Sequence, residues 1–264
     1  MKKIYYWHDP LNDDFGNMNI NVKDIPANYK YYSRNIFYLI AETILRIIAL
    51  PIVFVILKVG FLFRLKNRKV ISTIKGHSYF LYGNHTNFLV DAYAPYLISF
   101  PHKNHIITQP AAASIPGLKT LVKLLGVLPI SYTFNGLINL RKAISYLTSH
   151  HRVITIFPEA HIWPYYTDIR PFTKVSFHYP VDTNLPCFAI TTVYQKRFLS
   201  FIKLPKVVTY VDGPFYPDLS LPKEARVEKL RNDVYNAMKR RVDANPNYNY
   251  CEYIYKEDNN SNSY

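Results

Sequence analysis

The sequence predicts an α/β fold, in which a mixed, partly parallel sheet is flanked by helices and preceded by an N-terminal membrane-associated helical hairpin. Two observations carry this prediction. From residue 70 onward, short apolar runs typical of strands alternate with longer runs typical of helices, an order that favours a sheet with parallel neighbours. Before that point, residues 35–63 are nearly all apolar and are long enough to enter a membrane.

Length and charge limit the classes of function. The chain has 264 residues, enough for one domain with an appendage, and a formal net charge of +14. Such a charge favours polyanionic partners, which include nucleic acid, anionic lipid head groups and an acidic carrier. The basic residues are dispersed and form no recognised nucleic-acid-reading motif, so we expect no nucleic-acid partner. The two cysteines, Cys187 and Cys251, form neither a metal-ligand spacing nor a disulfide framework, which favours a reducing compartment and no bound metal.

Composition divides the chain into four parts. Residues 1–34 form a polar, irregular lead-in, and its first residues lack the apolar stretch of a signal peptide, so we expect no export by that route. Residues 35–69 contain the membrane segment and a basic flank. Residues 70–242 form the α/β domain, and residues 243–264 form a polar tail that is loose at its end.

The apolar segment, residues 35–63, is divided by Pro51 and carries basic residues on both sides. Because basic flanks tend to remain on the cytoplasmic side, the pattern predicts that both ends of the segment lie on the same face. We therefore expect two short helices hinged near Pro51, which dip into one leaflet from the cytoplasmic face of the cell membrane. A single membrane-spanning helix and a hairpin buried in the core are the alternatives.

The elements of the α/β domain are expected in a regular order. Strands joined by a turn come first, over residues 70–83. The elements that follow are a helix at 88–98, a strand from His105, a helix at 118–126, a short strand at 128–132, a helix at 138–150, a buried strand and turn at 152–160, strands at 185–194 and 206–214, and a helix that begins at Pro222.

Candidate catalytic side chains occur in YGNHTNFLVDAY, where His85 follows a strand and Asp91 lies in the next helix. Placed in the turn and in the helix, the two side chains can meet, with the imidazole Nδ1 hydrogen-bonded to the carboxylate. Nε2 would then accept a proton, and because no adjacent serine or cysteine sits in a sharp elbow, the pair suits a base that activates the substrate's own hydroxyl. A turn histidine that only caps the helix, beside an unrelated aspartate, is the alternative.

A second candidate follows another strand, in TIFPEAHIWPYY, where Pro158 and Glu159 come directly after an apolar run. Parallel strands deliver their carboxyl ends to one edge of a sheet, so Glu159 and His85 can face the same crevice. A loop carboxylate that caps a helix is the alternative for Glu159. The motif GNHTNFLVD, followed later in the chain by IFPEA, resembles the glycerolipid acyltransferase family, whose members include the 1-acylglycerol-3-phosphate acyltransferases.

This resemblance, which covers residues 70–215, implies a membrane-associated O-acyltransferase of phospholipid biosynthesis. It implies that His85 is the general base, that Asp91 orients it, and that Glu159 and Pro158 bind the acceptor. The acyl group would come from a thioester of CoA or of acyl carrier protein, and the acceptor would be a glycerolipid such as 1-acylglycerol-3-phosphate. Membrane lipids and the acyl donor are thus the expected partners, and no metal or other cofactor is required.

The sequence departs from the family where the family carries arginines that are linked to the acceptor's phosphate. After Phe-Pro-Glu it has Ala-His-Ile. The family's second block, which corresponds here to GVLPISY at residues 126–132, ends in Ser-Tyr, and the His-to-Asp spacing is one residue longer than the commonest one. Arg170 and Lys174 are the nearest cations that could bind an acceptor phosphate instead. The alternatives are a glycolipid or another acceptor without that phosphate, and a catalytically inactive membrane-binding relative.

Two more roles are expected for groups in these blocks. Backbone amides from Gly126 to Ile130, in the family's second block, would stabilise the oxyanion. The aromatic run Trp163 to Tyr166 could offer ring faces to a sugar or an acyl chain, or could form an interfacial rim.

Overall fold

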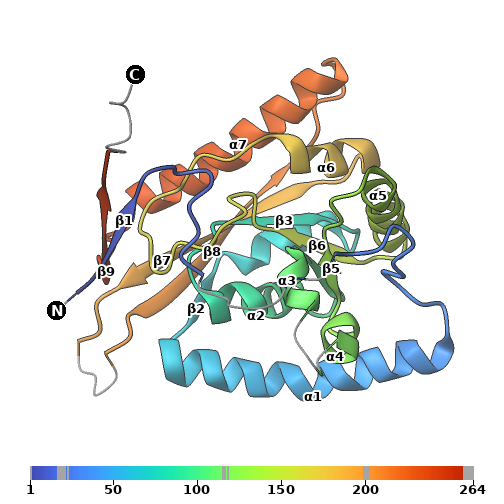
Figure 1. Ribbon diagram of the computed structural model, residues 1–264, viewed down its shortest axis with the longest axis horizontal. Helices are drawn as coiled ribbons and strands as arrows, with labels where there is room; N and C mark the ends of the chain where they lie inside the picture. The colour runs from blue at the N-terminus through green and yellow to red at the C-terminus, as the bar shows by residue number, and fades with distance from the viewer. Residues whose placement is uncertain are drawn as a thin grey trace, which may run out of the picture.

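A seven-stranded sheet lies at the centre of the computed structural model, which describes residues 2–16, 22, 24–114, 117, 119–198 and 203–257 (Figure 1). The strands are β1 (Lys3–Trp7), β2 (Arg64–Lys66), β3 (Phe80–Gly83), β4 (Asn104–Thr108), β5 (Val127–Pro129), β6 (Val153–Ile156), β7 (Cys187–Gln195), β8 (Lys206–Phe215) and β9 (Cys251–Tyr255). The helices are α1 (Ile36–Phe61), α2 (Phe88–Ser99), α3 (Pro110–Ala113), α4 (Lys119–Leu124), α5 (Phe134–Ser149), α6 (His178–Thr183) and α7 (Lys223–Asp243), with short 3-10 helices η1 (Arg68–Ile74) and η2 (Val175–Phe177).

The strands of the central sheet follow the order β2-β8-β7-β3-β6-β4-β5. All neighbours are parallel except β7 and β8, which are antiparallel. The predicted mixed, partly parallel sheet is therefore confirmed. Strands β3 and β6 pair directly, with Phe80 opposite Ile154 and Tyr82 opposite Ile156. Because they run in the same direction, the residues that follow Gly83 and Ile156 emerge side by side at one edge of the sheet.

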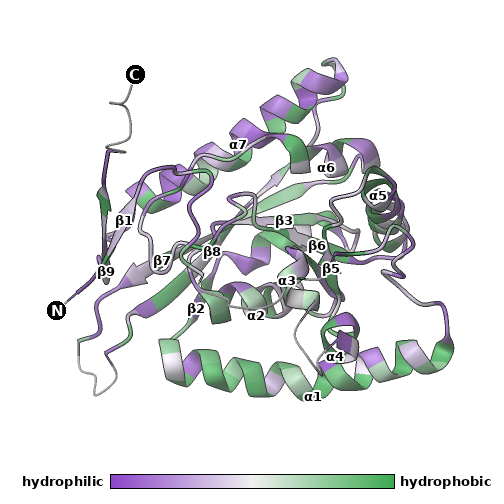
Figure 2. Cartoon of the chain, viewed as in Figure 1, coloured by the Kyte–Doolittle hydropathy of each residue, from purple (hydrophilic) through white to green (hydrophobic). Residues whose placement is uncertain are grey.

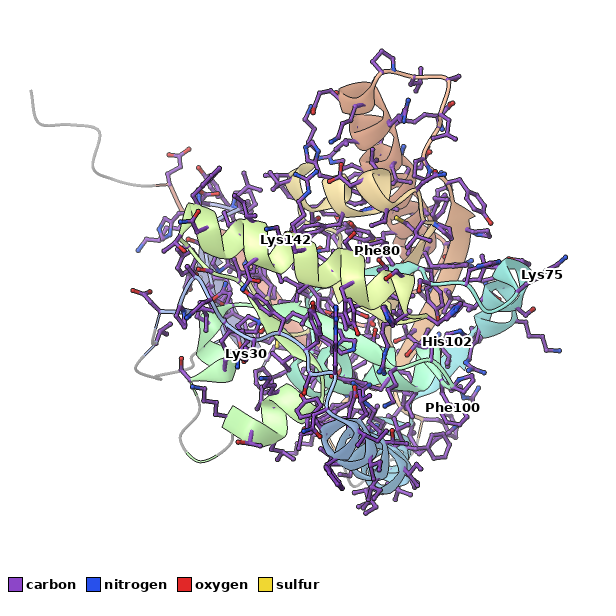
Figure 3. All side chains as sticks on the ribbon, turned by 90° about the vertical axis from the view of Figure 1, so that its right-hand side faces the viewer. Lys30, Lys75, Phe80, Phe100, His102 and Lys142 are labelled. Carbon is purple, nitrogen blue, oxygen red and sulfur yellow. The ribbon has the colours of Figure 1, made fainter. Side chains whose placement is uncertain are left out.

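Helices cover both faces of the sheet. Along β3, Phe80 and Tyr82 pack into the core shared with α5, α6 and α7, whereas Leu81 packs into the core shared with α1 and α2. This alternation follows from the pleat of a strand, in which successive side chains point to opposite faces. In Figure 3, Lys142 lies on the outer side of α5, and α1 lies on the far side of the sheet from it. The result is a three-layer α/β/α arrangement.

The predicted helical hairpin is wrong, because residues 36–61 form the single helix α1. Asn35 caps its start by accepting hydrogen bonds from the backbone N–H groups of Phe37 and Tyr38, and Leu62 ends it in the left-handed conformation. Pro51 lies inside the helix and is exposed. A proline removes one backbone donor, but the apolar residues on either side of it continue the helix and its packing.

Helix α1 buries charged side chains and exposes apolar ones, which is the reverse of the usual helix of a soluble protein. Glu42 and Arg46 are buried against the domain. The Glu42 carboxylate bonds Arg46, Lys103 and Arg152 at 3.0, 2.9 and 3.5 Å. The outward face is apolar (Figure 2), and its exposed side chains include Phe37, Ile40, Ile44, Ile47, Ile48, Ile52, Val55, Ile56 and Val59. Among the described residues, α1 is the one helix that is long and apolar enough to cross a membrane.

Three further expectations need correction. Residues 68–74 form the 3-10 helix η1 instead of a strand. The helix expected at 118–126 is limited to α4, with Leu118 outside the described residues, and Gly126 follows it at a positive φ of 91°. The polar lead-in and tail each contain a strand, because β1 and β9 pair with one another in parallel. The remaining expected helices and strands of the α/β domain are present, with ends shifted by a few residues.

Replacing Glu42 by Gln is expected to lower the free energy of unfolding by about 3 kcal/mol, because three cations lose their shared carboxylate and Arg46 stays buried. Denaturant unfolding in mild detergent measures the loss. Asp233→Asn, which breaks the exposed i,i+4 pair with Lys229, is the matched control and should have a much smaller effect. Equal losses for the two variants would contradict a buried ion network beneath α1.

Candidate active site

The turn after β3 is fixed by Asn84, which is buried. Its side-chain Nδ2 donates to the carbonyl of Thr192 at 3.0 Å, and its Oδ1 accepts from the Thr192 backbone N–H at 2.8 Å. These two hydrogen bonds to the neighbouring strand β7 hold the chain at the point where it leaves the sheet. His85 therefore begins its turn from a rigid position at the carboxyl edge of the sheet.

Asp91 meets His85 because helix α2 begins between them. Asn87 caps the helix by accepting from the backbone N–H of Val90, so Asp91 lies in the first turn. Its Oδ2 lies 2.9 Å from His85 Nδ1 and also accepts from the backbone N–H groups of Thr86 and Asn87, each at 2.9 Å. The longer His-to-Asp spacing is accommodated because the Asp91 carboxylate points toward the start of α2 and bonds the residues that precede the helix.

This geometry assigns the protons on the imidazole of His85. Ionised Asp91 can only accept, so Nδ1 of His85 carries the proton and Nε2 is an acceptor. Burial raises the pKa of Asp91, whereas the hydrogen bonds from His85, Asn87 and Thr86 lower it. The His85 ring stacks on Phe157, with centroids 4.9 Å apart, and its side chain is 24% exposed. A substrate can therefore reach the ring, whose orientation Asp91 and Phe157 restrict.

Glu159 lies beneath His85, with a carboxylate that is fully buried. It accepts from the backbone N–H of His85 at 3.0 Å, from the backbone N–H of Arg170 at 3.1 Å, and from Arg170 Nη2 at 3.1 Å. Burial raises the pKa of Glu159, and the Arg170 guanidinium opposes that shift. Glu159 is thus brought together with His85, as expected, but it holds the backbone of His85 and its charge is compensated within the protein.

In this structure, Glu159 and Arg170 are not positioned for the acceptor-binding roles expected for them. Both side chains have no exposed surface, and Arg170 also donates to the carbonyls of His161 and Pro10. Neither can contact an acceptor directly, because a fully buried ion pair offers no group to a ligand. Lys174 is exposed and lies near Glu224 and Glu228 of α7, at 3.7 and 3.8 Å. Pro158, in the turn after β6, is partly exposed.

The expected oxyanion amides and aromatic faces are also occupied. The backbone N–H of Gly126 donates to Lys123, and that of Ile130 donates to Thr108. Gly126 precedes the parallel strand β5, so it lies at the edge of the sheet opposite His85. Trp163 is buried, and its Nε1–H donates to the carbonyl of Asp13 at 2.8 Å. The ring faces of Trp163 are therefore used inside the protein.

Sequence reasoning missed two residues that shape the site, Asn84 and Phe157, and one ion pair between residues that it had named separately. Asn84 and Phe157 lie inside the two quoted motifs, where the signal was their position immediately after a strand. The pairing of Arg170 with Glu159 has no sequence signal, because the loop between them is irregular. Within the described part of the chain, no group of three or more His, Cys, Asp or Glu side chains could hold a metal ion.

Comparison with solved structures bears on the fold. No protein-family model matches the sequence, and no curated protein sequence matches it significantly. The crystal structure of the 1-acyl-sn-glycerophosphate (LPA) acyltransferase PlsC from Thermotoga maritima matches with a TM-score of 0.54 and 16% sequence identity. The match covers 80% of this chain and 89% of that chain. The two chains share a fold. The acyltransferase fold implied by the motif resemblance is therefore confirmed.

Replacing Arg170 by Ala is expected to lower the free energy of unfolding by about 3–5 kcal/mol, because it leaves the Glu159 carboxylate buried without its cation. Lys174→Ala is the matched control, since Lys174 is exposed and its ion pairs are long. That variant should change the stability by about 0.5 kcal/mol or less. Thermal or denaturant unfolding compares the two, and a stable, fully folded Arg170→Ala protein would contradict the structural role of the pair.

Proposed function

We propose that this protein is a membrane-associated O-acyltransferase that transfers a fatty acyl group from a thioester to a hydroxyl of a glycerolipid. His85 Nε2 takes the proton from the acceptor hydroxyl, and the oxygen attacks the thioester carbonyl. The carbon–sulfur bond breaks, an ester forms, and the thiol leaves with the proton that His85 returns. Asp91 keeps Nδ1 protonated and stabilises the imidazolium that forms in between.

The observation that carries this proposal is the His85–Asp91 pair at the carboxyl edge of a sheet with the acyltransferase fold. Because the imidazole proton is held on Nδ1, Nε2 of His85 is free to accept a proton. The neighbouring hydroxyl of Thr86 lies 2.8 Å from that of Tyr194, which occupies it. Both cysteines are buried. Direct transfer to the acceptor hydroxyl therefore fits these residues better than a covalent acyl-enzyme.

The acceptor class depends on what replaces the family's arginines. At the two positions involved, Ile162 and Ser131 are buried, Tyr132 is exposed but carries no charge, and Arg170 is paired with Glu159. These observations favour an acceptor without the lysophosphatidate phosphate, such as a glycolipid, over 1-acylglycerol-3-phosphate. CoA and acyl carrier protein both fit as donors, because both are anionic and the chain is strongly basic.

The arrangement of α1 favours a helix that lies in one leaflet. The helix is about 39 Å long at 1.5 Å per residue and contacts the domain along its length. Tyr38 bonds Lys123 near its start, Arg46 bonds Asn104 in its middle, and Leu57 is buried in the core near its end. If α1 crossed the membrane, these polar contacts with the domain would lie in the hydrocarbon layer, where burying polar groups costs free energy. We infer attachment at the cytoplasmic face of the cell membrane, because basic residues flank both ends.

His85→Ala is expected to reduce acyl transfer by about 100-fold or more while the protein stays folded, because a general base is lost. Asp91→Asn should impair the same step through the wrong tautomer. The loss is measured as turnover of radiolabelled acyl thioesters. Offering lysophosphatidate in one assay and phosphate-free diacyl and glycosyl acceptors in others identifies the acceptor. His77→Ala is the control, because His77 is exposed and lies just before the start of β3, at the end of the strand away from His85. Parental rates for His85→Ala would overturn the mechanism, whereas a parent protein that transfers no acyl group to any acceptor would leave a membrane-binding relative.

Cysteines placed at Arg34 and Arg64, on either side of α1, are expected to stay unlabelled by a membrane-impermeant maleimide in intact cells. Both should become labelled after permeabilisation, because a helix lying in the inner leaflet keeps both ends on the cytoplasmic side. The parent chain provides the background, since Cys187 and Cys251 are buried. Labelling of one site alone in intact cells would show that α1 crosses the membrane.

A further inference from the structure

The two ends of the chain meet in a strand pair beside the candidate active site. Strands β1 and β9 are parallel neighbours, with Lys3 opposite Cys251 and Trp7 opposite Tyr255. Figure 1 places them at the left of the view, away from α1. Within the described residues, they form a small sheet separate from the seven-stranded one. The rings of Trp7 and Tyr253 pack on Trp163, in the loop that follows β6.

That loop holds the backbone of His85 and its neighbour. The backbone N–H of Trp163 donates to the carbonyl of His85 at 3.1 Å, and that of Tyr165 donates to the carbonyl of Thr86 at 2.7 Å. On its other side, the His85 backbone N–H donates to Glu159. The peptide units around the histidine are therefore bonded on both sides by one loop, and a shift of the loop would shift the imidazole.

The backbone conformation of this loop is one that its residues disfavour. Ala160 has φ of 63° and Tyr165 has φ of 60°, which is the left-handed region. Residues with a Cβ are disfavoured there, because the Cβ crowds the following carbonyl. Such conformations persist only when surrounding contacts impose them. Contacts from the two chain ends are among those that impose this one.

Tyr253 of β9 provides two of those contacts. Its hydroxyl donates to the carbonyl of Pro164 at 2.8 Å, and its ring stacks on Trp163 with centroids 5.1 Å apart and planes 4° from parallel. The N-terminal segment provides two more, since Trp163 Nε1–H donates to Asp13 and the Phe15 backbone N–H donates to Ile162. The chain ends thus hold the middle of the loop between its two left-handed residues.

We propose that Tyr253 and Trp163 are positioning residues, through which the β1–β9 pair fixes the His85 backbone for proton transfer. The inference rests on the proposed acyl transfer for its catalytic consequence. Neither side chain touches substrate in this scheme. Displacement of a catalytic group by about 1 Å can cost about 100-fold in rate. A relaxed loop therefore lowers kcat, whereas donor and acceptor binding, which use other groups, change little.

The test compares three variants of the full chain in detergent or vesicles. Tyr253→Leu removes the ring stack and the hydroxyl, Tyr253→Phe removes only the hydroxyl, and Ile254→Ala changes the exposed residue on the opposite face of the same strand. Tyr253→Leu should lower kcat by about tenfold or more with KM nearly unchanged. Hydrogen exchange at the amides of Trp163 and Tyr165 should quicken by a similar factor. Ile254→Ala should match the parent in both measurements.

The smaller substitution keeps the test decisive if Tyr253→Leu folds poorly. Tyr253→Phe should lose about three- to tenfold in kcat, the value of one hydrogen bond, with a matching increase in exchange. Parental kcat and exchange in this variant, or losses equal to those in Ile254→Ala, would overturn the proposal. Failure of the proposed function looks different, because the parent would then transfer no acyl groups, or His85→Ala would equal it, while the exchange data still report on the loop.

Discussion

The buried carboxylate of Glu159 is the constraint on which the rest of the site depends. It is fully removed from water, so each of its hydrogen bonds must come from the protein. One donor is the backbone of His85, and the other two belong to Arg170. The carboxylate therefore joins the ends of β3 and β6 to the loop beyond them. The same carboxylate that pairs with Arg170 also sets where the His85 imidazole lies, because it bonds the His85 backbone.

The apolar helix α1 and the candidate site share one core. Leu57 and Phe61 of α1 lie in the same buried cluster as Val90 and Ala94 of α2, the helix that carries Asp91. Glu42 and Arg46 fix the other half of α1 through a buried ion network. The apolar helix is thus part of the domain and not a tether on a flexible linker. In the proposed function, this rigidity holds the carboxyl edge of the sheet at a constant position relative to the lipid surface.

The motif resemblance and the structure assign different tasks to the same residues. Resemblance places acceptor recognition on the Phe-Pro-Glu block and on cations near it, whereas the structure commits Glu159 and Arg170 to each other. Trp163, which the sequence offers as a ring for sugar or lipid, instead packs on Tyr253 and bonds the N-terminal segment. In the proposed function, groups outside the motifs would therefore recognise the acceptor, while the motif residues position His85 and hold its backbone.

The sequence alone determined the α/β class, most helices of the domain, and the meeting of His85 with Asp91, because these depend on periodicity and on a turn between neighbouring elements. It could not determine that α1 continues through Pro51, since the buried partners of Glu42 and Arg46 come from distant segments. It also missed β1 and β9, which become strands only by pairing with each other. Arg170 looked like a free cation in sequence. Only the tertiary structure decided that it neutralises Glu159, because burial and ion pairing arise when segments far apart along the chain come into contact.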